Sequence, residues 1–216
     1  MKWAVLVGKP RIQPLTGSWN AWKQTIADYC EGRCVYCAIP ESRFGGIRNF
    51  HIEHFRPKAK FRSLENEIGN LYLSCSICNV LKCDDWPAEP AADHSRAAYP
   101  DPSCTDFNTL LVVSVLTREV DSQTVAGKYL IEKVLLNRAQ LILERRLQAA
   151  LRSFKEFREW ADLAAPKMTR EELLEVVRFL CAVDKTQTDA LGRAPYRDGD
   201  TKRRLNPKEA KKGSRS

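Results

Sequence analysis

The sequence is organised around two neighbouring segments, FHIEHFRPKAKF at residues 50–61 and GNLYLSCSICNVLKCDDWP at residues 69–87. The first contains histidine-x-glutamate-histidine, and the second contains an asparagine followed by Cys-x-x-Cys-Asn. Two of the three histidines of the chain lie here, at His51 and His54. No other stretch gathers so many side chains of the kinds that bind metal ions or transfer protons. We therefore expect the functional site to be built from these residues.

A second cysteine pair lies upstream, so that Cys34-x-x-Cys37 and Cys75-x-x-Cys78 have the same spacing. Two cysteines three positions apart can bind one ion, and two such pairs complete a tetrahedral four-sulfur site. The 37 residues between the pairs, 38–74, exceed the ~15–20 of a compact zinc ribbon and are long enough to contain a β-hairpin. We predict a structural Zn²⁺ site, because a closed four-sulfur shell leaves no position for a catalytic water.

Cys30 and Cys83 lie close to these pairs and are the alternative ligands if one of the four is misassigned. The start of the chain, MKWAVLVGKPRIQP, has neither a long apolar region nor a small-residue cleavage site, so we expect no signal peptide. No apolar run approaches the ~20 residues of a membrane span. We therefore expect the protein in the cytoplasm, where cysteines stay reduced and Cys-x-x-Cys pairs bind metal ions.

The length of 216 residues, with 44% hydrophobic and 29% charged residues, suits a globular protein with one sizeable core, or a small domain with a helical companion. The net charge is +8, but residues 193–216 alone hold nine Lys/Arg against three Asp/Glu. This end of the chain either touches nucleic acid or is simply solvated. Because the rest of the chain is close to neutral, charge by itself does not indicate a nucleic-acid partner.

Local patterns predict an α+β fold in four parts. These are a strand and helix lead-in at 1–33, a zinc-containing core at 34–108, a strand plus helical region at 109–190, and a basic, disordered tail at 191–216. In the lead-in we expect a short strand at Trp3–Val7. A helix should follow that begins after Ser18, a good N-cap residue, and ends near Tyr29.

In the core, we expect a strand at 47–54 and a helix at 75–82. Residues 110–116, LLVVSVL, are the clearest strand candidate because they are rich in β-branched residues. Residues 126–164 have helical spacing and are long enough to be broken once. The sequence TREE opens a last helix at 169–184 as a capping box. We expect these helices to expose apolar side chains as a docking surface.

The side chains of the two central segments fit hydrolysis of a phosphodiester, which needs an activated water, a metal ion and positioning groups. His54 is the best candidate for the general base, since a neutral imidazole can accept a proton near pH 7. Glu53 and Asn79 offer the oxygen atoms that Mg²⁺ or Mn²⁺ prefers. His51 shares a strand face with Glu53 and could join the metal ligands or orient one. Asn79 follows Cys75 by one helical turn, so the zinc site would fix its position.

Basic residues flank this set. Arg56, Lys58 and Lys60 follow the histidine motif, and Lys82 comes one helical turn after Asn79. We interpret the first three as contacts to backbone phosphates, and we expect Lys82 to face a phosphate as well.

These residues, in this order, resemble the HNH, or ββα-metal, endonuclease family. The resemblance implies that His54 is the general base, that Glu53 and Asn79 bind the catalytic metal ion, and that Asn70 ties the hairpin together by hydrogen bonds. Glu53 stands where aspartate is more usual, and Asn79 where histidine is. Both keep an oxygen atom that can bind a metal ion. The implied fold is a zinc-braced ββα-metal core followed by a helical C-terminal region.

A longer pattern, made of IEHFRPK, NLYLSCSICNVLK, DDWP and YLIEKVLLNRAQLILERR, resembles the HNH nuclease subunit of Septu-type and retron-associated antiphage systems. It covers about residues 30–150 and implies cleavage of DNA, a role in defence against phage, and an SMC-like ATPase as partner. Two alternatives stay open: an RNase or tRNA-cutting toxin with the same site, and a zinc module that binds nucleic acid without cleaving it. The sequence does not separate DNA from RNA, because such sites contact the backbone.

Overall fold

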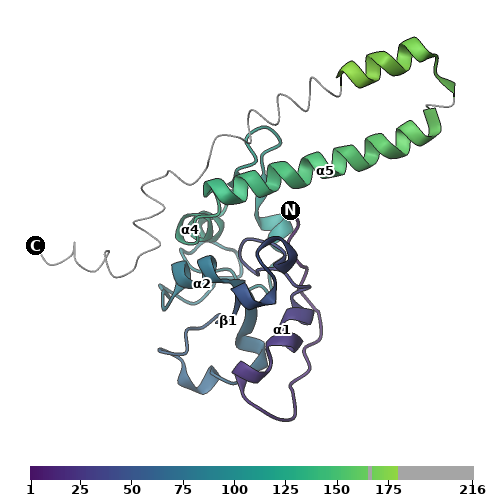
Figure 1. Cartoon of the computed structure of the whole chain (residues 1–216). Coiled ribbons are helices and arrows are strands. Elements are labelled where there is room, and N and C mark those ends of the chain that lie inside the picture. Colours follow the sequence, from purple (N-terminus) through teal and green to yellow (C-terminus); the bar gives the residue numbers. More distant parts are fainter. Residues whose placement is uncertain (165–166, 180–216) are drawn as a thin grey trace, which may run out of the picture.

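The computed structural model describes residues 1–164 and 167–179 of the chain. Short elements build the body of the protein, and a long helix leads away from it (Figure 1). In chain order, with η marking a 3-10 helix, the elements are η1 (Trp19–Ala21), α1 (Lys23–Tyr29), η2 (Glu41–Arg43), η3 (Ile47–Asn49), β1 (Phe50–His54), η4 (Arg62–Leu64), η5 (Ile68–Asn70), β2 (Leu71–Cys75), α2 (Ser76–Lys82), α3 (Phe107–Leu110), β3 (Val112–Val113), β4 (Val120–Asp121), α4 (Val125–Lys133) and α5 (Ala139–Ala164). A further helical stretch covers 170–179.

A ββα unit lies at the centre of the body. Strand β1 pairs antiparallel with β2, with Phe50 opposite Cys75 and His54 opposite Leu71. Helix α2 follows β2 without a loop, and the Cys75 sulfur at its N-cap accepts a hydrogen bond from the backbone N–H of Cys78. The expected strand, helix and mixed fold class are therefore confirmed, although β1 begins at Phe50 because η3 occupies 47–49.

The loop that carries the first cysteine pair is attached to β2. The backbone N–H of Val35 donates to the carbonyl of Leu73 at 2.8 Å. The loop then closes on itself, as the N–H of Ala38 donates to the carbonyl of Cys34 at 2.9 Å, and Ala38 takes the left-handed φ of 60°. This attachment brings the first cysteine pair alongside the end of β2, where the second pair begins.

The N-terminal segment corrects one expectation. No strand forms at Trp3–Val7, because the side chain of Asn108 takes the place of a partner strand. Its Oδ1 accepts from the N–H of Trp3, and its Nδ2 donates to the carbonyl of Trp3, both at 3.0 Å. The expected helix after Ser18 is present as η1 and α1, which ends at Tyr29 as predicted.

The strand expected at 110–116 is largely wrong. Asp106 caps α3 by accepting from the N–H of Asn108, so the start of this segment is helical. Only β3 is extended, and it pairs with the equally short β4 across a turn. Val115 and Leu116 lie in that turn and are 75% and 90% exposed. Their apolar side chains favour a strand by intrinsic propensity, but here they are exposed and packing does not stabilise a strand.

The expected long helix is broken once, between α4 and α5. Leu135 has a φ of 48°, and the N–H of Leu136 donates back to the carbonyl of Ile131 at 2.9 Å. This is a Schellman termination, in which the left-handed position usually holds glycine. The first half of α5 buries Leu141 and Arg145 against the body, and its second half projects away (Figure 1).

The last expected helix begins where the sequence predicts. The side chain of Thr169 accepts from the N–H of Glu172 at 3.3 Å, and Glu172 accepts from the N–H of Thr169 at 2.7 Å. The end expected near residue 184 and the tail at 191–216 lie outside the described residues. Among the helices described, none is both long and apolar enough to cross a membrane.

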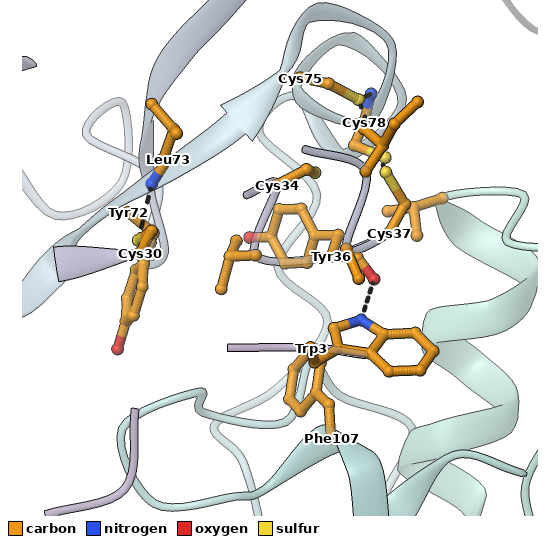
Figure 2. Packing of buried hydrophobic residues seen from close by; sticks show 14 of the residues in the cluster. Trp3, Cys30, Cys34, Tyr36, Cys37, Tyr72, Leu73, Cys75, Cys78 and Phe107 are labelled. Carbon is orange, nitrogen blue, oxygen red and sulfur yellow. Dashed lines mark hydrogen bonds between the residues drawn. The ribbon is translucent and has the colours of Figure 1, made fainter. Parts of the chain in front are cut away.

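Buried aromatic side chains fill the space between the ββα unit and the flanking segments. The core includes Trp3, Tyr36, Phe50, Tyr72 and Phe107. The indole N–H of Trp3 donates to the carbonyl of Tyr36 at 2.9 Å, directly beneath the cysteine loop (Figure 2). The N-terminal segment, the cysteine loop and α3 therefore share one core, and the site described next rests on it.

Candidate active site and cysteine cluster

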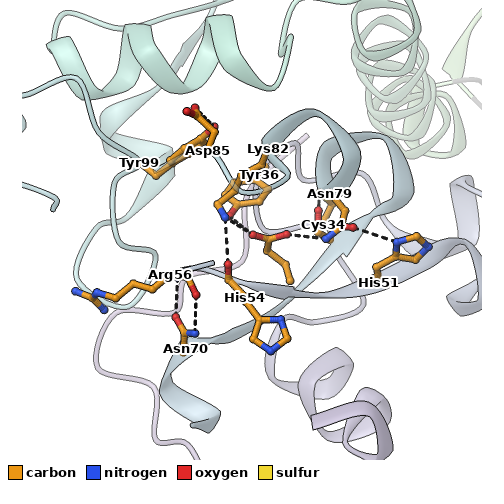
Figure 3. Close-up of polar contacts among 12 residues, drawn as sticks. Cys34, Tyr36, His51, His54, Arg56, Asn70, Asn79, Lys82, Asp85 and Tyr99 are labelled. Atoms are coloured by element: carbon orange, nitrogen blue, oxygen red, sulfur yellow. Dashed lines mark hydrogen bonds and ion pairs between the residues drawn. The ribbon is translucent and has the colours of Figure 1, made fainter. Parts of the chain in front are cut away.

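The ββα unit brings four of the predicted site residues to one cleft. Strand β1 supplies His51, Glu53 and His54, and α2 supplies Asn79. All four line a cleft of about 600 Å³, together with Lys58. Asn79 contacts both His51 and Glu53, and Figure 3 shows its contact with His51.

The carboxylate of Glu53 is almost completely enclosed and is 3% exposed. Its Oε1 lies 2.6 Å from the ammonium of Lys82 and accepts from the hydroxyl of Tyr36 at 3.2 Å. Its Oε2 accepts from Nδ2 of Asn79 at 2.7 Å. Burial raises the pKa of Glu53 above its ordinary value, whereas Lys82, Asn79 and Tyr36 act in the opposite direction.

The structure corrects the expectation for Lys82. Its side chain is fully buried, so it does not face a phosphate in solvent. Besides Glu53, its ammonium donates to the backbone carbonyl of His54 at 3.1 Å and lies 5.4 Å from the ring centre of Tyr99. Helix periodicity alone did not reveal that this turn of α2 faces the core.

His54 is held in a defined orientation. Its Nε2 lies 3.0 Å from the backbone carbonyl of Glu65, and the ring of Trp19 packs edge-on at 5.1 Å between centroids. A carbonyl only accepts hydrogen bonds, so Nε2 carries the proton and Nδ1 is the nitrogen that can accept one. Burial lowers the pKa of His54, and the bond to Glu65 opposes this shift. The imidazole is therefore neutral near pH 7.

Asn79 contacts two other residues of the candidate metal site, His51 and Glu53. Its Oδ1 lies 3.2 Å from Nδ1 of His51, while its Nδ2 contacts Glu53. His51 itself is exposed. The carboxylate of Glu53 and the amide oxygen of Asn79 are donors that suit a hard divalent cation, and they lie on adjacent elements of one cleft.

Asn70 lies away from the metal donors and holds the loop that follows β1. Its Oδ1 accepts from the N–H of Arg56 at 2.7 Å, and its Nδ2 donates to the carbonyls of Arg56 and Leu64 at 3.0 and 3.2 Å. These bonds join the two ends of the excursion between β1 and β2, which matches the role that the sequence resemblance implies for it.

The basic residues predicted to contact phosphate differ in their surroundings. Lys58 lines the cleft, with its ammonium 4.3 Å from the ring centre of Trp19 and 3.5 Å from Oε1 of Glu65. Arg56 instead pairs with Glu89 at 2.8 Å, and it is not among the residues that line this cleft. Lys58 is therefore the better placed of the two to meet a nucleic-acid backbone in the cleft.

The two cysteine pairs meet in one buried cluster. The sulfurs of Cys34, Cys37, Cys75 and Cys78 all lie within 4.8 Å of one another (Figure 2). The sulfurs of Cys37 and Cys75 are 3.8 Å apart. Zn–S bonds of about 2.3 Å in a tetrahedron place sulfurs about 3.8 Å apart, so the arrangement of the four sulfurs is compatible with a zinc ion. Although burial opposes ionisation, hydrogen bonds from the other three sulfhydryls lower the pKa of Cys34, which favours a thiolate.

The two alternative cysteines lie outside this cluster. The sulfur of Cys30 accepts from the backbone N–H of Leu73 at 3.3 Å, and burial raises its pKa to about 12. Cys83 is exposed. Seven of the eight cysteines lie in the described part of the chain, and none of those seven forms a disulfide.

Three neighbours of the site were missed by the sequence reasoning. Tyr36 lies inside the Cys-x-x-Cys loop, so its place in the motif could have indicated its contact with Glu53. Trp19 packs against His54 from the lead-in at 1–33, outside the two central segments. Arg138 lies 3.6 Å from the sulfur of Cys78, and nothing local to its sequence indicates this contact.

No curated protein and no solved structure matches the chain. A family model does match a part of it. Residues 34–85, which span the four clustered cysteines, both central strands and α2, match the model of the HNH endonuclease family, and this supports the placement of the segment in that family.

Proposed function

We propose that this protein is a metal-dependent endonuclease that hydrolyses phosphodiester bonds of DNA. The observation that carries the proposal is the convergence of Glu53, His54 and Asn79 on one cleft of about 600 Å³. An acidic and an amide oxygen beside a neutral imidazole are the donor set and the base that such a reaction needs. Lys58 at the same cleft offers a charge for the backbone.

His54 would act as the general base. Its Nε2–H is committed to the carbonyl of Glu65, which leaves Nδ1 to accept the proton of a water that attacks the phosphorus. The lowered pKa keeps the imidazole neutral and ready to accept a proton near pH 7. Trp19 restricts the ring and shields one side of it.

Glu53 and Asn79 would hold the catalytic Mg²⁺ or Mn²⁺, and His51 is placed to join them or to orient Asn79. A divalent cation there would neutralise charge that develops on the phosphate and on the leaving oxygen. Lys82 and Tyr36 fix the carboxylate from behind, so that Glu53 presents Oε2 toward Asn79.

The four cysteines would hold a structural Zn²⁺. A closed four-sulfur shell has no open coordination position, so zinc there braces the fold and does not take part in hydrolysis. Cys75 is the N-cap of α2, one helical turn before Asn79, and Cys78 directly precedes Asn79 in the chain. The zinc site would therefore set where the amide of Asn79 lies relative to β1.

A role in defence against phage, in the cytoplasm and beside an SMC-like ATPase, is the biological part of the proposal. It rests on the longer sequence pattern at about residues 30–150. The second half of α5 leaves Leu151, Phe154 and Leu163 exposed, at 53%, 62% and 74%, which is the kind of surface a partner covers. An ATPase gene beside this one, and loss of phage resistance when either gene is deleted, would support this part.

Two other functions remain as alternatives. The same site would cleave RNA, including tRNA, if the cleft admits it, and parallel assays on DNA and RNA of one sequence decide between them. A zinc module that only binds nucleic acid would need the four cysteines but not His54 or Asn79. The arrangement of Asn79 against Glu53 favours the catalytic interpretation over this one.

The decisive experiment replaces His54 by alanine. We expect cleavage of DNA in Mg²⁺ or Mn²⁺ to fall by ~10²–10⁴, while zinc content and thermal unfolding stay unchanged. His94→Asn is the matched control, because His94 does not line the cleft and its φ of 56° is one that asparagine tolerates. Normal cleavage by the His54→Ala protein would overturn the nuclease assignment and leave the binding module in its place.

A further inference from the structure

The pair formed by Glu53 and Lys82 is unusual for a residue that is to hold a divalent cation. The side chains are 3% and 0% exposed, and the distance between Oε1 and the ammonium is 2.6 Å. Tyr36 donates to the same oxygen. Oε1 is thus fully engaged inside the protein, and Oε2, which accepts from Asn79, is the oxygen left for a ligand in the cleft.

The charge of Glu53 is also balanced before any cation arrives. Lys82 neutralises it within the core, and the cleft is otherwise lined by the charged residues Lys23, Lys58 and Asp84. Tight sites for divalent cations gather several carboxylates. Here the fixed charges at the cleft sum to no net negative charge, so the free protein offers little electrostatic attraction for Mg²⁺ or Mn²⁺.

We infer that the catalytic cation and the nucleic acid bind this cleft cooperatively, and that Lys82 is the positioning residue that makes them depend on each other. The scissile phosphate supplies the negative charge and the oxygen donors that Glu53, offset by Lys82, does not. The cation in turn adds a positive charge beside Glu53 that attracts the phosphate. This inference rests on the proposed nuclease function and specifies how the same site would be loaded.

Cooperative loading has a direct consequence for binding measurements. If bound nucleic acid increases the affinity for the cation by some factor, the bound cation must increase the affinity for nucleic acid by the same factor. A cleft that binds the cation only beside its substrate would also stay unloaded when no substrate is present. Cleavage would then follow the joint occupancy of both ligands rather than the cation concentration alone.

The test uses zinc-loaded His54→Ala protein, which cannot cleave and which keeps the backbone carbonyl that Lys82 contacts. Binding of Mn²⁺ is followed by electron paramagnetic resonance with and without a DNA duplex. We expect the duplex to increase the affinity of the protein for Mn²⁺ at least ~10-fold. Mn²⁺ should increase the affinity for the duplex by the same factor. The same protein with the additional change Asn79→Ala subtracts Mn²⁺ that is bound to DNA alone.

Two variants test the charge argument. Lys82→Met in the same background should tighten Mn²⁺ in the absence of DNA and reduce the coupling factor. Because this change leaves Glu53 buried without its counter-charge, Lys23→Glu provides a second route: it makes the cleft more negative and leaves the buried pair intact. Like Lys82→Met, Lys23→Glu should increase the affinity for Mn²⁺ in the absence of DNA and reduce the coupling factor. Lys155→Glu, an equal change of charge on exposed α5, should shift neither.

The outcomes separate this inference from the proposed function. Tight Mn²⁺ binding without DNA, unchanged when DNA is added, would overturn the inference even if the wild-type protein cleaves DNA. Failure to bind Mn²⁺ under either condition would overturn it as well, and a protein that also fails to cleave would lose the nuclease assignment. Coupled binding in a protein that cleaves only RNA would keep the inference and change the substrate.

Discussion

The guanidinium of Arg138 lies 3.6 Å from the sulfur of Cys78, although 60 positions separate the two residues. Its second Nη also lies 3.9 Å from the sulfur of Cys75, and its first Nη donates to the carbonyl of Val134 at the end of α4. Arg138 is 6% exposed. The segment between α4 and α5, which lies outside the family match, therefore borders the cysteine cluster.

This contact predicts that Arg138 stabilises the bound zinc. A four-thiolate zinc site carries two negative charges, and a buried guanidinium beside it offsets part of them. We expect Arg138→Met to weaken zinc binding by ~10–100-fold and Arg138→Lys to recover part of the loss. Competition with a chromogenic chelator measures the affinity. Arg146→Met, an exposed change on α5, should leave it unaltered, and equal affinities for the Arg138→Met and wild-type proteins would contradict the prediction.

The cluster also predicts which cysteines matter for the metal. Purified protein should hold one zinc ion per chain, because four sulfurs meet at one point. Cys78→Ser should lose most of this zinc and much of the cooperative unfolding, since metal binding contributes folding energy. Cys83→Ser should keep both, because Cys83 is exposed and outside the cluster. Elemental analysis decides, and a zinc content that falls in Cys83→Ser would show that the ligand set is wrong.

Sequence reasoning succeeded where local spacing determines structure. The distance from Cys75 to Asn79 fits one helical turn, and the capping box at Thr169 depends on residues three apart, so both could be recognised in the sequence. It failed where a distant partner decides the outcome. Residues 110–116 have strand propensity, but only Val112 and Val113 pair with another strand. Lys82 is buried because its ammonium pairs with the buried carboxylate of Glu53 on β1. No local pattern indicates such tertiary contacts.

Asn70 should act on the fold rather than on the chemistry. It is 4% exposed and makes three hydrogen bonds to the backbone of Arg56 and Leu64. Asn70→Ala would leave partly buried backbone groups without these partners, at a cost of up to about 1–3 kcal/mol each. Urea unfolding should therefore show a loss of at least ~2 kcal/mol, against a small change for the exposed Asn49→Ala. A fully stable Asn70→Ala protein that no longer cleaves would instead assign Asn70 a part in the reaction.

Lys58 and Arg56 should differ in their effect on nucleic-acid binding. Lys58 lines the cleft, whereas Arg56 is paired with Glu89. We expect Lys58→Ala to weaken DNA binding for all sequences and to reduce the slope of log K against log salt by ~1. Arg56→Ala should have the smaller effect on this slope. Titrations at several salt concentrations, in the His54→Ala background to prevent cleavage, compare the two variants. A larger effect of Arg56→Ala would contradict the prediction and place the DNA backbone beside Arg56 rather than Lys58.

The pH dependence of cleavage should report the environment of His54. Burial lowers its pKa below the ordinary value of ~6.5. The base acts only in its neutral form, so kcat/KM should rise as the pH increases through the lowered pKa and should be level by pH 7. A cation bound at Glu53 would lower this pKa further, since a nearby positive charge disfavours the imidazolium. Trp19→Ala would expose the ring to water and weaken the burial effect, so the acid limb of the profile should move to higher pH, toward ~6.5. An acid limb of the wild-type protein at or above pH 6.5, or one that Trp19→Ala leaves in place, would contradict the assignment of His54 as a buried general base.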